Sequence, residues 1–96
     1  MEFEWDEEKN KENIHKHELD FADAWEIFDA PMLTHLDTRE DYGEDRWIGM
    51  GFLKNFIVVV TYTEREDVIR LISLRKALKH ERTRFEENLR NEMGES

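Results

Sequence analysis

The 96-residue chain contains no cysteine, one proline and four glycines. The lack of cysteine excludes disulfide bonds and thiolate metal sites, so a hydrophobic core has to hold the fold, and nothing favours an oxidising compartment. The longest strongly apolar stretch, residues 56–60, is far shorter than the roughly 20 residues of a membrane-spanning helix. The chain does not open with a basic start and an apolar run, as a secretory signal does. We therefore expect one cytoplasmic domain over residues 1–96, with no membrane partner.

Positive charge is scarce overall but concentrated in one segment. The formal net charge is −10, and residues 1–48 carry sixteen acidic and five basic residues. Residues 65–84 instead carry seven basic and three acidic residues. A net negative charge opposes long-range association with free nucleic acid, whereas a local basic surface can still bind phosphate. The contrast predicts a phosphate-binding surface on an otherwise acidic protein.

The first half of the chain predicts an edge strand, two helices and a loop. Residues 3–5 alternate as a short strand, and Asp6 suits the N-cap of a helix over residues 7–17. A second helix opens at Asp20 and ends before the proline. Its apolar face should join the core through Phe21, Ala24, Trp25 and Phe28. The polar segment 37–45 should be an exposed, mobile loop whose acidic residues could dock basic residues of a partner.

The second half predicts three strands joined by short turns. Residues 46–53 and 68–75 place successive side chains on alternate faces, as strands do, and the unbroken apolar run that starts at Phe56 suits a central strand. Lys54 and Asn55 make a tight turn, and residues 63–67 turn the chain again. The predicted fold class is α+β, with an antiparallel meander sheet, two N-terminal helices and one C-terminal helix.

The last helix is predicted over residues 76–93, with Gly94 as its C-terminal cap. Its apolar stripe consists of Leu78, Phe85, Leu89 and Met93. At about 100° per residue, Arg82 falls near the centre of this stripe. A guanidinium at this position has to extend past the apolar residues to water, form an ion pair with a carboxylate or belong to a functional site.

Three segments together resemble one protein family. They are FEWDEEKNKENIHKHELDFADAWEIFD, YTEREDVIRLISLRKA and KHERTRFEE, in this order. Their motifs resemble the BrnT family of bacterial type II toxins, small relatives of the RelE-like ribonuclease fold. The match extends over roughly residues 3–87, and the order and spacing of the motifs make it specific.

The resemblance implies a ribonuclease toxin that cleaves RNA and so arrests translation and growth. It also implies a tightly bound BrnA-type antitoxin of the ribbon-helix-helix class, and contact with operator DNA only through that antitoxin. The matching catalytic positions are Arg65 in T-E-R, Arg75 at a strand end and Arg82 in E-R. Lys79 and His80 stand where the family often carries other basic residues. The strongly acidic composition departs from that of many toxic ribonucleases.

RNA cleavage without a metal ion requires a base, an acid and cations that stabilise the phosphoryl oxygens. Arginine suits the last task because its planar fork donates two hydrogen bonds and stays charged. His80 is the candidate for proton transfer, since histidine titrates near neutrality. His15 and His17 lie about 200° apart on a helix and do not share a metal ion easily. We expect neither a metal nor another cofactor.

Other interpretations of these residues remain open. Arg70, Arg84 and Arg90 are typical solvated charges, and Arg75 could form a plain salt bridge at a strand end. The chain as a whole could be a non-catalytic protein of the same fold that acts as a corepressor with its antitoxin. It could also be a small domain that binds RNA without cutting it.

Overall fold

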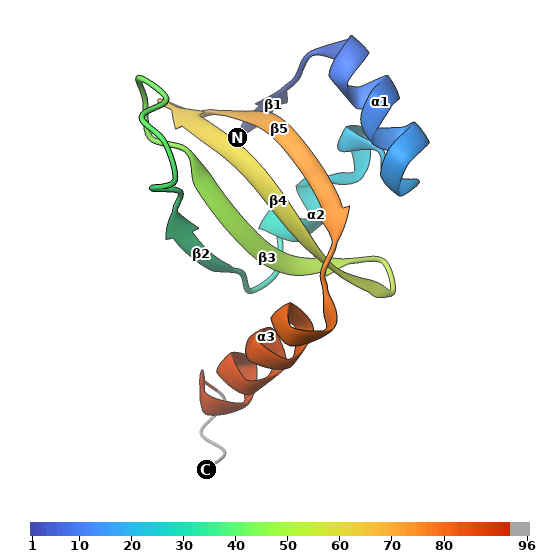
Figure 1. Cartoon of the computed structure of the whole chain (residues 1–96), viewed down its shortest axis with the longest axis vertical. Helices are drawn as coiled ribbons and strands as arrows, with labels where there is room; N and C mark the ends of the chain where they lie inside the picture. Colours follow the sequence, from blue (N-terminus) through green and yellow to red (C-terminus); the bar gives the residue numbers. More distant parts are fainter. Residues whose placement is uncertain (93–96) are drawn as a thin grey trace.

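The computed structural model describes residues 1–92, which form an α+β fold around one five-stranded sheet (Figure 1). The strands lie in the order β1-β5-β4-β3-β2. The elements are β1 (Glu2–Glu4), α1 (Glu7–His17), the 3₁₀ helix η1 (Phe21–Asp23), α2 (Trp25–Phe28), β2 (Leu33–Leu36), β3 (Trp47–Leu53), β4 (Phe56–Arg65), β5 (Val68–Lys76) and α3 (Lys79–Glu92). Among residues 1–92, no helix is long and apolar enough to cross a membrane.

The sheet is mixed, so the prediction of a purely antiparallel meander is wrong. The meander is present in β3, β4 and β5, which pair antiparallel in sequence order. However, β1 pairs parallel to β5 at one edge, and β2 adds an antiparallel strand at the other edge. Strand β2 was not predicted, because it has four residues, three of them exposed, and therefore lacks a period-two pattern of apolar residues.

Both turns of the meander contain two residues. Lys54 and Asn55 join β3 to β4, as predicted, and Lys54 adopts the left-handed conformation with φ of 55°. The next turn is tighter than predicted, because β4 continues to Arg65 and only Glu66 and Asp67 separate it from β5. Glu66 also has a positive φ, 53°. Positive φ at the first turn residue suits the twist of a two-residue hairpin.

One face of the sheet is covered by α1, η1 and α2 (Figure 1). The predicted second helix is a 3₁₀ turn followed by the single α-helical turn of α2. Ile27 of α2 packs so closely on β3 that a Cβ at Gly51 would lie 2.8 Å from its Cγ2. Phe21 is buried, but Trp25 is 49% exposed, so its predicted place in the core is wrong. The break between the two short helices rotates Trp25 away from the sheet.

Helix α1 is attached mainly by asparagine side chains. Asp6 caps it as predicted and accepts a hydrogen bond of 2.9 Å from the Glu8 N–H. The buried residues of the helix are Asn10 and Asn13. Asn13 accepts a hydrogen bond of 3.1 Å from the Leu74 N–H of β5 and donates one of 3.0 Å to the Leu19 carbonyl. The Asn13 side chain therefore takes the place of a neighbouring strand beyond the end of β1.

The other face of the sheet carries α3 at one end, and we call it the α3 face. Phe85 is buried there with Met50 and Val59, and its ring meets that of Phe52 edge-on at 5.2 Å. The helix begins at Lys79, three residues later than predicted, so Leu78 precedes it and is 56% exposed. Leu78 is therefore not part of the apolar stripe that was predicted for this helix. Met93 and Gly94, its predicted end, lie outside the described residues.

Replacing Asn13 with alanine should lower the free energy of unfolding by about 2 kcal/mol or more, because it leaves a buried N–H and a carbonyl without partners. The measurement is urea denaturation followed by circular dichroism. Asn91→Ala, at an exposed position of α3, is the matched control and should change stability little. Equal stability of the two variants would contradict the role assigned to Asn13.

Candidate active site

Four of the five predicted site residues lie at the junction between β5 and α3, residues 75–82. Arg75 is the penultimate residue of β5 and pairs across the sheet with Val59, which places it on the α3 face. Lys79 and His80 are exposed in the first turn of α3, and Arg82 follows one turn into the helix. The chain thus gathers cations where a strand ends and a helix N-terminus adds a partial positive charge.

Glu81 holds this junction together. Its two carboxylate oxygens accept hydrogen bonds of 2.8 and 2.9 Å from Nη1 and Nη2 of Arg75. The same carboxylate accepts a 2.8 Å hydrogen bond from the Leu78 N–H just before the helix, as in a capping box. The Arg75 hydrogen bonds are the main cause that lowers the pKa of Glu81 to about 2, and they raise the pKa of Arg75. Glu81 was not predicted as a site residue, although an acid at the third position of the helix is a capping signal.

Arg75 keeps donors available beside this ion pair. Its three hydrogen bonds, two to Glu81 and one of 3.3 Å to the Lys76 carbonyl, use Nη1 twice and Nη2 once. A guanidinium has five N–H donors, so Nε–H and the second Nη2–H remain. These two point to the same edge of the planar group and form a fork that matches two phosphate oxygens.

Arg82 is exposed and does not lie within an apolar stripe, contrary to prediction, because Leu78 is outside the helix. Its Nη1 donates a 3.0 Å hydrogen bond to the Ala77 carbonyl. Arg75 bonds to the carbonyl of the neighbouring residue, Lys76. Both guanidiniums are therefore tied to the same short stretch of backbone.

Arg65, the fifth predicted residue, lies on the same face but at the other end of the meander. It is six residues along β4 from Val59, the partner of Arg75, which corresponds to about 20 Å of strand. Arg65 Nη2 is 2.9 Å from the Glu44 carboxylate in an exposed ion pair. The buried side chains of Thr61 and Thr63 lie between these positions on β4. The structure therefore does not join Arg65 to the junction.

The loop between β2 and β3 contributes an arginine that was not among the predicted site residues. Arg39 donates to the Asp37 carboxylate through Nε at 2.8 Å and Nη2 at 2.7 Å. These bonds are the main cause that lowers the pKa of Asp37. The Arg39 charge also opposes, as a smaller effect, the rise in the pKa of Arg75 that the Glu81 hydrogen bonds cause, so the field of Arg39 reaches Arg75. The D-x-R spacing was a local signal, but nothing in the sequence showed where the loop folds.

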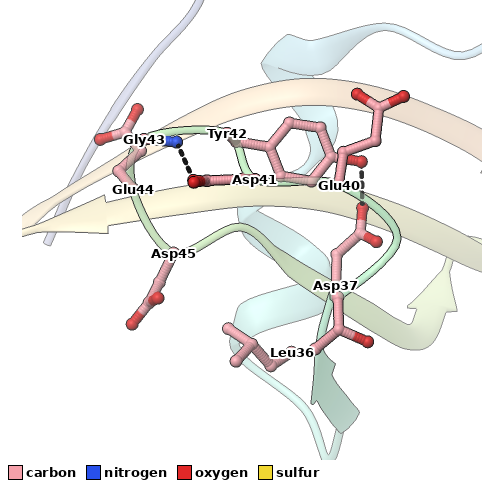
Figure 2. Close-up of a pocket in the computed structure, with 9 residues that line it drawn as sticks. Leu36, Asp37, Glu40, Asp41, Tyr42, Gly43, Glu44 and Asp45 are labelled. Carbon is pink, nitrogen blue, oxygen red and sulfur yellow. Dashed lines mark hydrogen bonds between the residues drawn. The ribbon is translucent and has the colours of Figure 1, made fainter.

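The prediction of an exposed loop over residues 37–45 is wrong for Asp37, whose side chain is fully buried. Figure 2 shows the Tyr42 hydroxyl directed at this carboxylate, to which it donates a 3.2 Å hydrogen bond. The loop borders a hollow of about 740 Å³. Its acidic lining is Asp37, Glu40, Asp41, Glu44 and Asp45. Carboxylates repel phosphate, so the hollow is a poor RNA site in spite of its size.

Within residues 1–92, histidine, aspartate and glutamate side chains do not form any group of three that could hold a metal ion. The junction itself presents arginine, lysine and histidine side chains. These groups can bind a phosphodiester and transfer a proton.

A family model of the ribonuclease toxin BrnT, of type II toxin-antitoxin systems, matches residues 5–81. The chain belongs to the BrnT family. A search of curated proteins found no match. The family match includes Arg65, Arg75, Lys79 and His80 and ends one residue before Arg82. It also includes Glu81, so the ion pair that orients Arg75 lies within the BrnT segment.

Stability should depend on pH through Glu81. Its pKa is about 2 in the folded protein against an ordinary 4.5, so the folded state is favoured above pH 4.5 and loses this contribution as the pH falls towards 2. Glu81→Gln resembles the protonated form. The difference in free energy of unfolding between parent and variant should therefore be largest above about pH 5 and shrink towards pH 2.

Urea denaturation at a series of pH values measures this difference. Glu87→Gln, at an exposed position of the same helix, removes an equal charge and serves as the control. A constant difference between the parent and Glu81→Gln over the whole range would show that the ion pair does not stabilise the fold.

Proposed function

We propose that this BrnT-family chain is a metal-independent endoribonuclease whose active site is the junction between β5 and α3. The observation that carries the proposal is the bidentate Arg75–Glu81 pair, with Arg82 and His80 on either side of Glu81 in the chain. This pair fixes a guanidinium at a strand end and leaves its Nε–H and second Nη2–H without hydrogen bonds among residues 1–92. Preorganised cations of this kind stabilise charge that grows during phosphoryl transfer.

In the proposed reaction, the 2′-hydroxyl of RNA attacks the adjacent phosphorus atom. A base takes the hydroxyl proton, the P–O5′ bond breaks, and an acid returns a proton to the leaving 5′-oxygen. The products are a 2′,3′-cyclic phosphate and a 5′-hydroxyl end. His80 performs one proton transfer, since imidazole titrates near neutrality and this side chain is exposed. Arg75 and Arg82 hold the phosphoryl oxygens, and Lys79 adds a cation beside them.

Arg39 and Arg65 have a different part in the proposal. Arg39 is tethered by a buried carboxylate near Arg75, and Arg65 is about six residues away along the sheet. One position beside the proposed active site and one further along the sheet suit contacts with neighbouring phosphates of an RNA strand, which position the substrate without specifying sequence.

The cellular role follows from the family. A type II toxin is paired with an antitoxin, and we propose a BrnA-type ribbon-helix-helix protein that carries the complex to operator DNA. The chain itself would act in the cytoplasm and arrest growth by cleaving RNA. Its acidic loop supports such a partner, because the carboxylates around the 740 Å³ hollow can receive basic side chains.

A second function, corepression without catalysis, is favoured by one observation. Arg65 and Arg75 are each paired with a carboxylate, and the net charge is −10, so the attraction for RNA is weaker than the number of arginines indicates. A corepressor would bind the antitoxin and the operator complex without cleaving RNA.

Cleavage of a defined RNA by the purified chain in excess chelator tests the proposal. Arg75→Ala, Arg82→Ala and His80→Gln should each slow cleavage by about 100-fold or more, because each removes a group at the reacting phosphate. Arg65→Ala should slow it much less. Arg90→Ala, in the last turn of α3, controls for loss of positive charge and for contaminating nuclease.

Three outcomes separate the candidates. Loss of cleavage in the junction variants alone supports the proposed active site. Cleavage that persists in all variants would overturn it. A parent that binds an antitoxin of this class and represses its operator, yet cleaves no RNA with or without ribosomes, would establish the corepressor.

A further inference from the structure

Two hollows meet at Lys76, beside the candidate active site. One, of about 380 Å³, is lined by His15, Lys16, His17, Glu18, Lys76 and Leu78. The other, of about 450 Å³, is lined by Asn55, Phe56, Ile57, Lys76, Ala77, Arg82 and Glu86. They join the end of α1 to the start of α3 across the end of the sheet. We call this continuous surface the Lys76 surface.

The Lys76 surface exposes an aromatic ring beside a cation. Phe56 follows the turn between β3 and β4 and is 43% exposed. The Lys76 ammonium lies 4.4 Å from the centre of its ring. A cation on one part of an aromatic ring keeps that ring in place, so that the remaining exposed area is presented in a fixed orientation. Leu78 adds a second exposed apolar side chain.

The cations of the Lys76 surface differ in their ion pairing from Arg39, Arg65 and Arg75. Arg39, Arg65 and Arg75 are all paired with carboxylates. Lys16, Lys76 and Arg82 form no ion pair with any carboxylate among residues 1–92. Their charge is therefore not neutralised by an ion pair within the described part of the chain. On a chain with a net charge of −10, this surface is a local place where a phosphate backbone can approach.

We propose that the Lys76 surface binds single-stranded RNA next to the phosphate that is cleaved, an inference that rests on the proposed ribonuclease function. A base stacks on Phe56, while Lys76 and Lys16 contact the phosphates that lead away from the site. Arg82 links the two regions, because it borders the hollow beside Phe56 and belongs to the junction. Aromatic rings set among cations are the means by which proteins hold single strands without reading sequence.

A single strand fits this surface better than the alternatives. In a duplex the bases are stacked on each other and do not reach an isolated ring, whereas unpaired bases of RNA do. A protein partner for an exposed ring and leucine would more often meet a surface without unpaired cations, because charged residues are depleted at the centres of protein interfaces.

Fluorescence anisotropy with a labelled single-stranded 2′-O-methyl RNA tests the inference at low salt. This probe has no 2′-hydroxyl, so binding is measured without cleavage. Phe56→Ala should weaken binding about tenfold through loss of stacking, and Phe56→Trp should retain or strengthen it. Lys76→Gln should lower the slope of log affinity against log salt by about 0.7, the value for one lost phosphate contact on a single strand. Arg90→Gln is the charge-matched control and should leave the slope unchanged.

The result does not depend on the outcome of the cleavage assay. Binding that weakens in Phe56→Ala and recovers in Phe56→Trp supports the inference even if the chain cleaves nothing. Parent-like binding by Phe56→Ala and Lys76→Gln, or no binding by the parent, overturns it even if cleavage is established. Loss of antitoxin binding in these variants with RNA binding intact also overturns it, and assigns the surface to a protein. Circular dichroism confirms folding, since Phe56 lies outside the buried core.

Discussion

The candidate site depends on the hydrogen bonds that the Glu81 carboxylate accepts. This carboxylate accepts hydrogen bonds from the Leu78 N–H just before α3 and from the guanidinium of Arg75 near the end of β5, so one side chain fixes both the start of the helix and the orientation of Arg75. Lys79, His80 and Arg82 are positioned by that helix start. A shift of one residue in the start of α3 would rotate these side chains by about 100° relative to Arg75. The ion pair is therefore more important for the geometry of the site than for its charge.

At the edge of β5 that faces α1, an asparagine side chain fixes the position of the helix. Beyond the three residues paired with β1, the β5 edge meets α1, whose Asn13 satisfies the Leu74 N–H. This contact also sets the end of α1, and with it Lys16 and His17, beside Lys76. The two polar contacts on β5 thus bring two groups of cations to the same end of the sheet.

The sequence predicts the parts of this fold that have a local signal. Alternation gives β3 and β5, the apolar run gives β4, and Asp6 gives the start of α1. The missed parts depend on contacts between distant residues. An asparagine that replaces a strand partner looks like any helical asparagine, and β2 exists only because β3 offers it an edge. In the site, the sequence shows the positive charge of residues 65–84. It does not show that the length of the hairpin separates Arg65 from Arg75. Nor does it show that the path of a loop brings the charge of Arg39 within reach of Arg75.

A strongly acidic chain can bind RNA if attraction and orientation are performed by different cations. The arginines Arg39, Arg65 and Arg75 are held by carboxylates, which reduces their long-range attraction but fixes the orientation of their guanidinium groups. Lys16, Lys76 and Arg82 have no bonded carboxylate among residues 1–92, so they supply most of the local attraction. Under this division, salt should weaken capture of the strand more than it slows cleavage of RNA already bound, because screening acts on exposed charges. The acidic remainder of the surface is then compatible with catalysis and available to a basic partner.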